Sequence, residues 1–417
     1  MDRAGEGRKA LYNGTVRLYR SDAAWILVIA LFFVTCIELF YRMIVRFNGV
    51  YPSDMHYYAI TAVEKEHLDP RLIDIISRGL YSINNNTMEF NIFLATLIPL
   101  IIVANFFAIR FFVSDDLMMQ KVPRYTIQAA SVLALFTGPV FIPILHEYYY
   151  MHSFAAFAWH NPKQHAMTLL SLVGTICFLK MFIVYKEQQT ISLKYWISST
   201  LALFLSATAK PSFVIEFVPS VIVLFLIELF SGEKKNLVSR FKSLFIMGCT
   251  LLPAGLYIIW LSTVDFGDTN GMEGAIEVVF GLSQALSHKN VLHIFVFGMP
   301  FTITVLIANY KRIRDSKYFM AFMIFVWGVA QWLFFGEAGE RAKHGNFDWG
   351  RMYGTYFLAL VALSLLIENI YYPNSVFPNS KRARKIYIIV AIVLLTLSVL
   401  SQFTYFGYVL SGRKYMR

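Results

Sequence analysis

The chain has little of what soluble enzymes and secreted domains depend on. Charged residues make up only 15% of its 417 positions, and cysteine occurs at three, Cys36, Cys177 and Cys249. Each cysteine lies inside an apolar run, without a disulfide pattern or a zinc-ligand spacing. A Walker loop, a dinucleotide fingerprint and a Gly-x-Ser-x-Gly turn are also missing from the sequence. Nucleotide-binding folds, serine hydrolases and disulfide-linked domains are therefore not predicted.

What the chain has instead is apolar sequence. Hydrophobic residues make up 57% of it, in runs long enough to cross a hydrocarbon core, which takes roughly 20 residues per helix. We therefore predict an all-α, multi-pass integral membrane bundle, a single transmembrane domain over 1–417, with about eleven membrane-spanning helices. The expected spans are 23–41, 90–109, 126–145, 167–185, 195–208, 213–230, 243–262, 291–309, 319–335, 352–368 and 385–408.

Lysine and arginine concentrate in alternate loops of this arrangement. They occupy the N-terminal segment and the loops at 121–124, 186–194, 234–242, 311–317 and 381–385. We expect a plasma-membrane protein, and the positive-inside rule then places its N-terminus in the cytoplasm. Arg413, Lys414 and Arg417 disagree, because an odd number of spans puts them outside. The net charge of +11 belongs mostly to loops that face anionic lipid, so no nucleic-acid partner is predicted.

Three outer loops are long or polar enough to carry function. Loop 46–89 contains an amphipathic helix pattern after Asp69-Pro70, which predicts a helix lying along the membrane surface. Its apolar positions are Leu72, Ile73, Ile76 and Leu80, and its polar positions are Arg71, Asp74 and Arg78. Loop 263–290 repeats the apolar pattern at 275–282 and predicts a second interfacial helix. Loop 337–351 has the densest set of polar residues.

All of the polar clusters fall in the outer loops, and none of the nine histidines is placed inside. Asp54 follows the first span, beside His56 and among tyrosines. A carboxylate near apolar and aromatic surface can serve as a general base for a hydroxyl. The alternative is a surface aspartate that only begins a loop helix.

Lys210 joins two expected spans with almost no loop. Its ammonium group is forced to the outer interface, where ionisable groups are costly and commonly bind a charged partner. Pro211 frees backbone groups that a ligand could use. The alternative is a lysine that merely extends its side chain to the interface.

Loop 337–351 combines cations, glycines and aromatic rings. Arginine and lysine bind phosphate oxygens, glycine lets a ligand approach the backbone, and Trp349 and Phe347 suit stacking on a sugar. Its candidate binding residues are Arg341, Lys343, His344, Asn346, Asp348 and Arg351. The stretch around Trp159 adds His160, Asn161 and Lys163. A solvated loop held by salt bridges is the alternative.

These features together resemble the GT-C superfamily of polyprenyl-linked glycosyltransferases. The stretches Trp-His-Asn-Pro at 159–162, Lys-Pro-Ser at 210–212 and Gly-Asn-Phe-x-Trp-Gly at 345–350 are also similar to membrane proteins of Gram-positive surface-polysaccharide loci. The resemblance implies a GT-C-like fold. It also implies inverting transfer of a sugar from a polyprenyl-phosphate donor to a cell-surface glycan or lipid-linked acceptor.

The resemblance further assigns roles to the candidate residues. Asp54 would remove the proton of the acceptor hydroxyl. The departing phosphate would be stabilised by Lys210, Arg341, Lys343 and Arg351, and the substrates would be bound and oriented by His56, His160, Asn161, Lys163, His344, Asn346 and Asp348. Many relatives carry an acidic pair where this chain has Asp54 with His56. No cofactor is therefore predicted, and a divalent cation stays open.

Two other classes of protein stay open. A repeat-unit polymerase would use the same lipid-linked sugars on the same face, with larger arginine-rich outer loops. A transporter or flippase would place polar residues at the midplane, around broken helices. Glu38, expected to pair with Arg42, and Glu216, just below Lys210, both lie in the outer half instead, which favours the enzyme.

Overall fold

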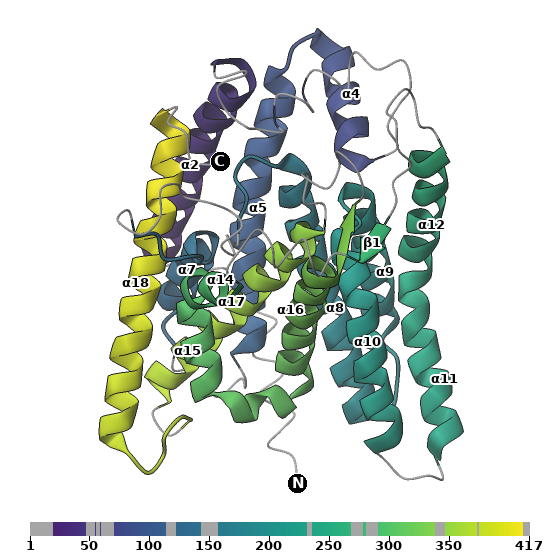
Figure 1. Cartoon of the computed structure of the whole chain (residues 1–417), viewed down its shortest axis with the longest axis vertical. Coiled ribbons are helices and arrows are strands. Elements are labelled where there is room, and N and C mark those ends of the chain that lie inside the picture. Colours follow the sequence, from purple (N-terminus) through teal and green to yellow (C-terminus); the bar gives the residue numbers. More distant parts are fainter. Residues whose placement is uncertain are drawn as a thin grey trace.

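A helical bundle is the architecture of the protein (Figure 1). The structure, a computed structural model, describes residues 20–46, 55, 59, 71–113, 122–142, 157–231, 236–267, 278–280, 291–337, 347–372 and 375–411. In this part of the chain, eight helical segments are long and apolar enough to cross a membrane. The protein is therefore an all-α helical membrane protein in class, as the sequence predicts.

Seven of these segments contain one α-helix each, the first of them extended by a π-helix, and one segment contains two α-helices. The single helices are α2 (Arg20–Tyr41), α5 (Met88–Phe112), α8 (Pro162–Gln188), α10 (Ser212–Ser231), α16 (Ser316–Phe334), α17 (Asp348–Tyr371) and α18 (Lys381–Ser411). The composite run consists of α11 (Leu237–Gly248), the 3-10 turn η5 (Cys249–Leu251) and α12 (Leu252–Gly267). The helix α2 continues into a short π-helix, η1 (Arg42–Arg46).

The other three expected spans are not confirmed as continuous membrane-spanning helices. At 195–208 the structure has α9 (Leu193–Ala209), which is 17 residues long. At 126–145 the helix α7 (Arg124–Leu133) and the turn η2 (Ala134–Phe136) give way to chain without regular secondary structure at 137–142, which includes Pro139. At 291–309 the helix breaks between α14 (Val291–Gly298) and α15 (Pro300–Ala308). Proline lacks an N–H and clashes with the preceding turn, which explains both breaks.

Backbone amides of the first broken segment are hydrogen-bonded to the second broken segment and to α18. The amide of Val140 donates to the carbonyl of Phe297 at 2.8 Å, and the amide of Phe141 donates to Oγ of Ser401 on α18 at 2.9 Å. Hydrocarbon offers no hydrogen-bond partners, so irregular backbone at membrane depth must be paired inside the protein. The breaks are thus stabilised by contacts between segments far apart in sequence.

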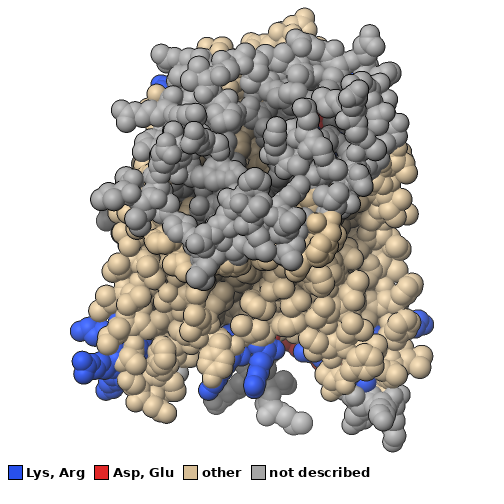
Figure 2. All heavy atoms as spheres, viewed as in Figure 1, with Lys and Arg blue, Asp and Glu red and all other residues tan. Residues whose placement is uncertain are grey.

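Basic side chains gather at one end of the bundle, which we call the basic end (Figure 2). The turn η6 (Tyr310–Arg314), which is rich in basic residues, and the start of α18 lie at this end in Figure 1. At the other end, Nη1 of Arg42 donates to the carbonyl of Leu410 at 2.7 Å. The last helix, α18, therefore ends beside the end of α2, away from the basic end.

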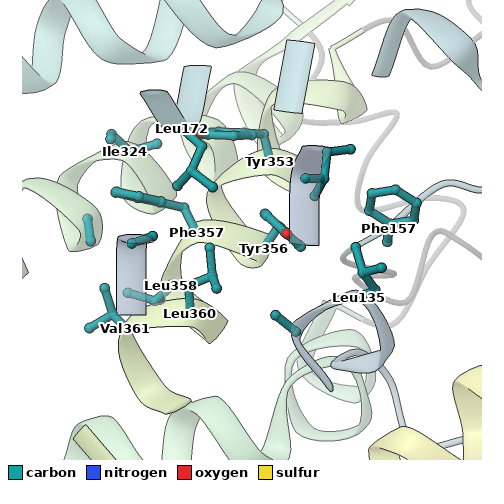
Figure 3. Close-up of a cluster of buried hydrophobic side chains, with 14 of the residues drawn as sticks. Leu135, Phe157, Leu172, Ile324, Tyr353, Tyr356, Phe357, Leu358, Leu360 and Val361 are labelled. Atoms are coloured by element: carbon teal, nitrogen blue, oxygen red, sulfur yellow. The ribbon is translucent and has the colours of Figure 1, made fainter. Parts of the chain in front are cut away.

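The helix α17 is the centre of the bundle. In its spanning stretch 94% of residues are buried, against 17% in α2. Figure 3 shows Leu135, Phe157, Leu172 and Ile324, from other parts of the chain, around the α17 residues Tyr353, Tyr356 and Phe357. A Cβ at Gly354 would lie 2.8 Å from Cα of Phe325, so glycine allows α16 to approach α17 closely.

Two of the outer loops differ from expectation. In loop 263–290 the predicted helix is wrong at β1 (Val278–Phe280), which pairs antiparallel with β2 (Phe335–Glu337). The β-branched Val278 and Val279 favour extended chain once such a partner is present. Loop 337–351 ends earlier than expected, because α17 already begins at Asp348. Loop 46–89 contains α4 (Leu72–Asn84), in which Asp74 is buried rather than on an exposed polar face.

Candidate functional site

Four helix ends meet at the end of the bundle opposite the basic end. They are the starts of α8, α10 and α17 and the last turns of α16. Of the candidate residues chosen from sequence, the structure describes the side chains of His160, Asn161, Lys163, Lys210 and Arg351. Asp54, His56, Arg341, Lys343, His344 and Asn346 lie outside the described residues. For Asp348 only the backbone position, at the start of α17, is described.

Lys210 lies directly over an aromatic ring. The helix α9 ends at Ala209 and α10 begins at Ser212, so Lys210 takes an extended conformation between them. Its Nζ lies 3.3 Å from the centre of the Trp349 ring, in the first turn of α17. The negative face of an indole attracts an ammonium group, most strongly where water is partly excluded. The contact holds the positive charge of Lys210 between the start of α10 and the start of α17.

His160 lies near the same tryptophan. The centres of the His160 and Trp349 rings are 6.3 Å apart, and Nδ1 of His160 is 3.2 Å from the hydroxyl of Tyr405. Only 3% of His160 is exposed. We call His160, Lys210 and Trp349 the cation–ring cluster. It offers a cation, an imidazole and a half-buried ring at one point.

Arg351 belongs to the same turn of α17 but faces α16. Positions 349 and 351 are about 200° apart around a helix, so their side chains point to different sides. The Arg351 guanidinium carbon lies 4.6 Å from the centre of the Trp332 ring on α16, and the residue is fully buried. Two cations thus bracket the start of α17, each on a tryptophan.

Glu216, on the second turn of α10, contributes a buried carboxyl group beside this turn. A Cβ added at Gly350 would lie 2.0 Å from its Oε1, and one added at Gly328 would lie 2.9 Å from its Oε2. The carboxyl group therefore occupies space that the two glycines leave open. From sequence, Glu216 was placed near Lys210 but given no role. The glycines that make its slot are more than a hundred residues away in the chain, which hid the relationship.

Asn161 and Lys163 have packing roles in the structure. Asn161 caps α8, because its side chain accepts from the amide of Gln164 at 3.0 Å. Nζ of Lys163 lies 2.6 Å from Oδ2 of Asp74, and both side chains are buried. The pair holds α4 against the start of α8. The sequence placed Asp74 on the polar face of its helix, but the helical pattern gave no sign of its distant partner Lys163.

The described part of the chain contains no cluster of metal-binding side chains. Among these residues there is no group of three or more His, Cys, Asp or Glu side chains that could hold a metal ion.

Comparison with protein-family models gave no match, and no curated protein matches the chain. The class that fold and site define is thus a polytopic helical membrane protein with a cation–ring cluster at one end.

Proposed function

We propose that the protein is a membrane glycosyltransferase of the GT-C type. It would move a sugar from a polyprenyl-phosphate donor to a cell-surface glycan or a lipid-linked acceptor. The observation that supports this most is the cation–ring cluster, in which Lys210 lies 3.3 Å from the Trp349 ring and His160 lies beside it. An ammonium group attracts phosphate oxygens, and an indole packs on the apolar face of a sugar. The cluster therefore suits a ligand in which a phosphate is joined to a sugar.

The place of the cluster suits a lipid-linked ligand. It lies where α10 and α17 begin, so a phosphate bound there would hold its lipid tail at the level of the helices. Ile215 and Ile222 of α10 are 42% and 51% exposed, as expected of residues that face lipid in a spanning helix. A polyprenyl chain could lie along such a surface without an enclosed tunnel.

The proposed chemistry is inverting transfer. Asp54 takes the proton of the acceptor hydroxyl while its oxygen attacks the anomeric carbon, and the bond from that carbon to the phosphate oxygen breaks. Lys210 stabilises the charge on the departing phosphate. Arg351, expected from sequence to share this role, is fully buried against Trp332 instead. His160 and Trp349 orient the sugar. The roles of Asp54, Arg341 and Lys343 rest on the resemblance to the superfamily alone.

Orientation favours a lipid-linked donor over a nucleotide sugar. The positive-inside rule places the basic end in the cytoplasm, so the cation–ring cluster would face the outside of the plasma membrane. Nucleotide sugars are not expected on that side. The partners we propose are therefore a polyprenyl-phosphate sugar, a glycan or lipid-linked acceptor, and the surrounding lipids.

A second candidate is a transporter of lipid-linked glycans. One observation favours it: the broken segments at 137–142 and 298–299 meet through the hydrogen bond from Val140 to Phe297. Broken helices at membrane depth commonly line transport sites. The cavity beside them, lined by Thr302, Thr355 and Ser398 among others, measures only about 10 Å³. That is space for about one water molecule, which is too small for a glycan. The cation–ring cluster therefore supports the transferase more strongly than this cavity supports a transporter.

Deletion and complementation test the choice. The gene is deleted, the sugar composition and linkages of the surface polysaccharide are measured, and wild type or Asp54→Asn is restored at equal expression. Loss of one sugar substituent that only wild type restores supports the transferase with Asp54 as base. Unchanged linkages with altered chain length point to a polymerase. Full rescue by Asp54→Asn removes Asp54 from the mechanism.

A further inference from the structure

Glu216 has a fully buried carboxyl group that lacks hydrogen bonds. Its side chain is 0% exposed, and neither Oε1 nor Oε2 has a hydrogen-bond partner among the described residues. An ionised carboxylate in such surroundings pays a large desolvation cost, whereas the neutral acid pays far less. Ionisable side chains within membrane segments usually mark functional sites. The burial of Glu216 therefore indicates a functional group whose protonation state matters.

Gly328 and Gly350 shape the space around this group. Alanine at Gly350 would place its Cβ 2.0 Å from Oε1, and alanine at Gly328 would place its Cβ 2.9 Å from Oε2. The carboxyl group thus touches the backbone of α16 on one side and the first turn of α17 on the other. Gly350 directly follows Trp349 of the cation–ring cluster, so the carboxyl group lies at the same turn of α17 as the proposed binding point.

Among the described residues, neither Lys210 nor Arg351 forms an ion pair with Glu216. The guanidinium of Arg351 lies over Trp332, and the ammonium of Lys210 lies over Trp349. Within the described residues, Glu216 takes part in no ion pair, although five are present elsewhere, at Arg42, Arg124, Lys163, Lys186 and Arg312. A buried charge is normally paired when a partner is within reach. The geometry fits a neutral group.

We propose that Glu216 is held as a carboxylic acid and donates a hydrogen bond to an oxygen of the anionic group bound at the cation–ring cluster. The identity of that anion, a lipid phosphate, rests on the proposed function. An ionised carboxylate would repel phosphate. The acid form instead adds an O–H donor at the first turn of α17, the turn that carries Trp349, and hydrogen bonds to charged acceptors are the stronger kind.

Infrared difference spectroscopy tests the protonation state. The spectrum of the Glu216→Gln variant is subtracted from that of the wild-type protein at pH 7, both purified in the same detergent. We expect a C=O stretching band of a protonated carboxylic acid in the difference. Glu38→Gln is the matched control, because Glu38 is half exposed and bound to Arg42 at 2.6 Å, and should show carboxylate bands instead. Carboxylate bands in the Glu216 difference would overturn the proposal.

Ligand binding tests the donor role. Farnesyl phosphate is the probe, and farnesol is the same chain without phosphate. Replacing Glu216 by leucine removes the donor and should weaken binding of farnesyl phosphate by roughly tenfold or more, while glutamine keeps an N–H donor and should stay within about threefold. Binding of farnesol should not change. Thermal unfolding of each variant establishes that it is folded.

The outcomes separate this inference from the proposed function. If wild type binds farnesyl phosphate and the leucine variant binds it equally well, the donor role of Glu216 is wrong and the proposed function stands. Equal losses for farnesol and farnesyl phosphate also overturn the donor role, because the effect is then not specific to phosphate. If wild type binds no farnesyl phosphate, the proposed function fails, and this inference fails with it.

Discussion

The ammonium nitrogen of Lys210 lies 3.3 Å from the centre of the Trp349 ring. This contact joins the junction of α9 and α10 to the first turn of α17, across 139 positions of sequence. It places a positive charge and an aromatic face together at the end of the bundle opposite the basic end. The anionic, sugar-bearing lipid that we propose as the ligand would meet both groups at once.

Replacing Lys210 should weaken phosphate binding specifically. We expect Lys210→Met to raise the Kd for farnesyl phosphate by about tenfold or more, because a charge-assisted contact is lost, and Lys210→Arg to change it little. Lys194→Met is the matched control, since Lys194 also lies over a ring, that of Tyr195, but at the basic end. Isothermal titration in detergent provides the measurement. Equal effects of the two methionine variants would contradict the site.

The ion pair between Lys163 and Asp74 should contribute to stability rather than to binding. Removing one partner leaves a buried charge, so Lys163→Met should lower the free energy of unfolding by about 3–5 kcal/mol. The double variant with Asp74→Leu should recover most of this loss. Denaturant unfolding in detergent micelles measures both. A single variant as stable as wild type would show that the pair does not hold α4 to α8.

Close packing of α16 on α17 predicts a strong effect at Gly354. Its added Cβ would meet Cα of Phe325 at 2.8 Å, and backbone cannot move aside as a side chain can. Gly354→Ala should therefore destabilise the protein by about 1–3 kcal/mol. Gly255→Ala on α12 is the control, because nothing lies within 4 Å of its added Cβ. The two variants are compared by thermal unfolding, and equal melting temperatures would refute the close approach.

A buried polar contact ties the broken helix to the centre of the bundle. The hydroxyl of Tyr356 donates to Oδ1 of Asn105 at 2.5 Å, and Nδ2 of Asn105 donates to the carbonyl of Ser131 on α7 at 3.0 Å. Tyr356→Phe should cost about 1 kcal/mol of stability. Tyr125→Phe, at a 61% exposed position, should cost nothing measurable. A loss of the same size at both positions would contradict the role of this contact.

The positions of η6 and of the end of α18 predict opposite labelling of two introduced cysteines. In a variant whose native cysteines are replaced by alanine, Ser411→Cys should react with a membrane-impermeant maleimide in intact cells. Arg314→Cys, at the basic end, should react only after permeabilisation. Reversed labelling would show that the basic end faces outside. Labelling of both from one side would show that the two ends do not lie across a membrane.

Local patterns predicted local structure well. Apolar runs predicted helices that agree with the eight apolar helical segments, and the spacing of Glu38 and Arg42 predicted their ion pair, which the structure confirms at 2.6 Å. Both depend on residues within one or a few turns. Such information is fully contained in a short stretch of sequence.

Non-local partners account for what sequence reasoning missed. The break after η2 is stabilised by Phe297 and Ser401, which are remote in the chain. The strand Val278–Phe280 needs its partner at 335–337. A single sequence shows neither partner, so apolar composition alone favoured continuous helices.

The candidate site was predicted in part. His160 and Lys210, chosen from sequence, meet at Trp349 in the structure, whereas Lys163 pairs with Asp74. Residue type shows which side chains suit phosphate or sugar. It does not show which of them already have a partner within the fold. Binding of substrate by the cluster stays a prediction.

The pool of lipid-linked sugars tests the proposed reaction most directly. Lipid extracts of the deletion strain, of the strain restored with wild type and of the strain restored with Lys210→Met are compared by mass spectrometry. A transferase that lacks function leaves its donor unused, so we predict that a polyprenyl-phosphate monosaccharide accumulates in the deletion and Lys210→Met strains and returns to its normal level with wild type. An unchanged donor pool, or accumulation of lipid-linked oligosaccharide repeats instead, would contradict the transferase.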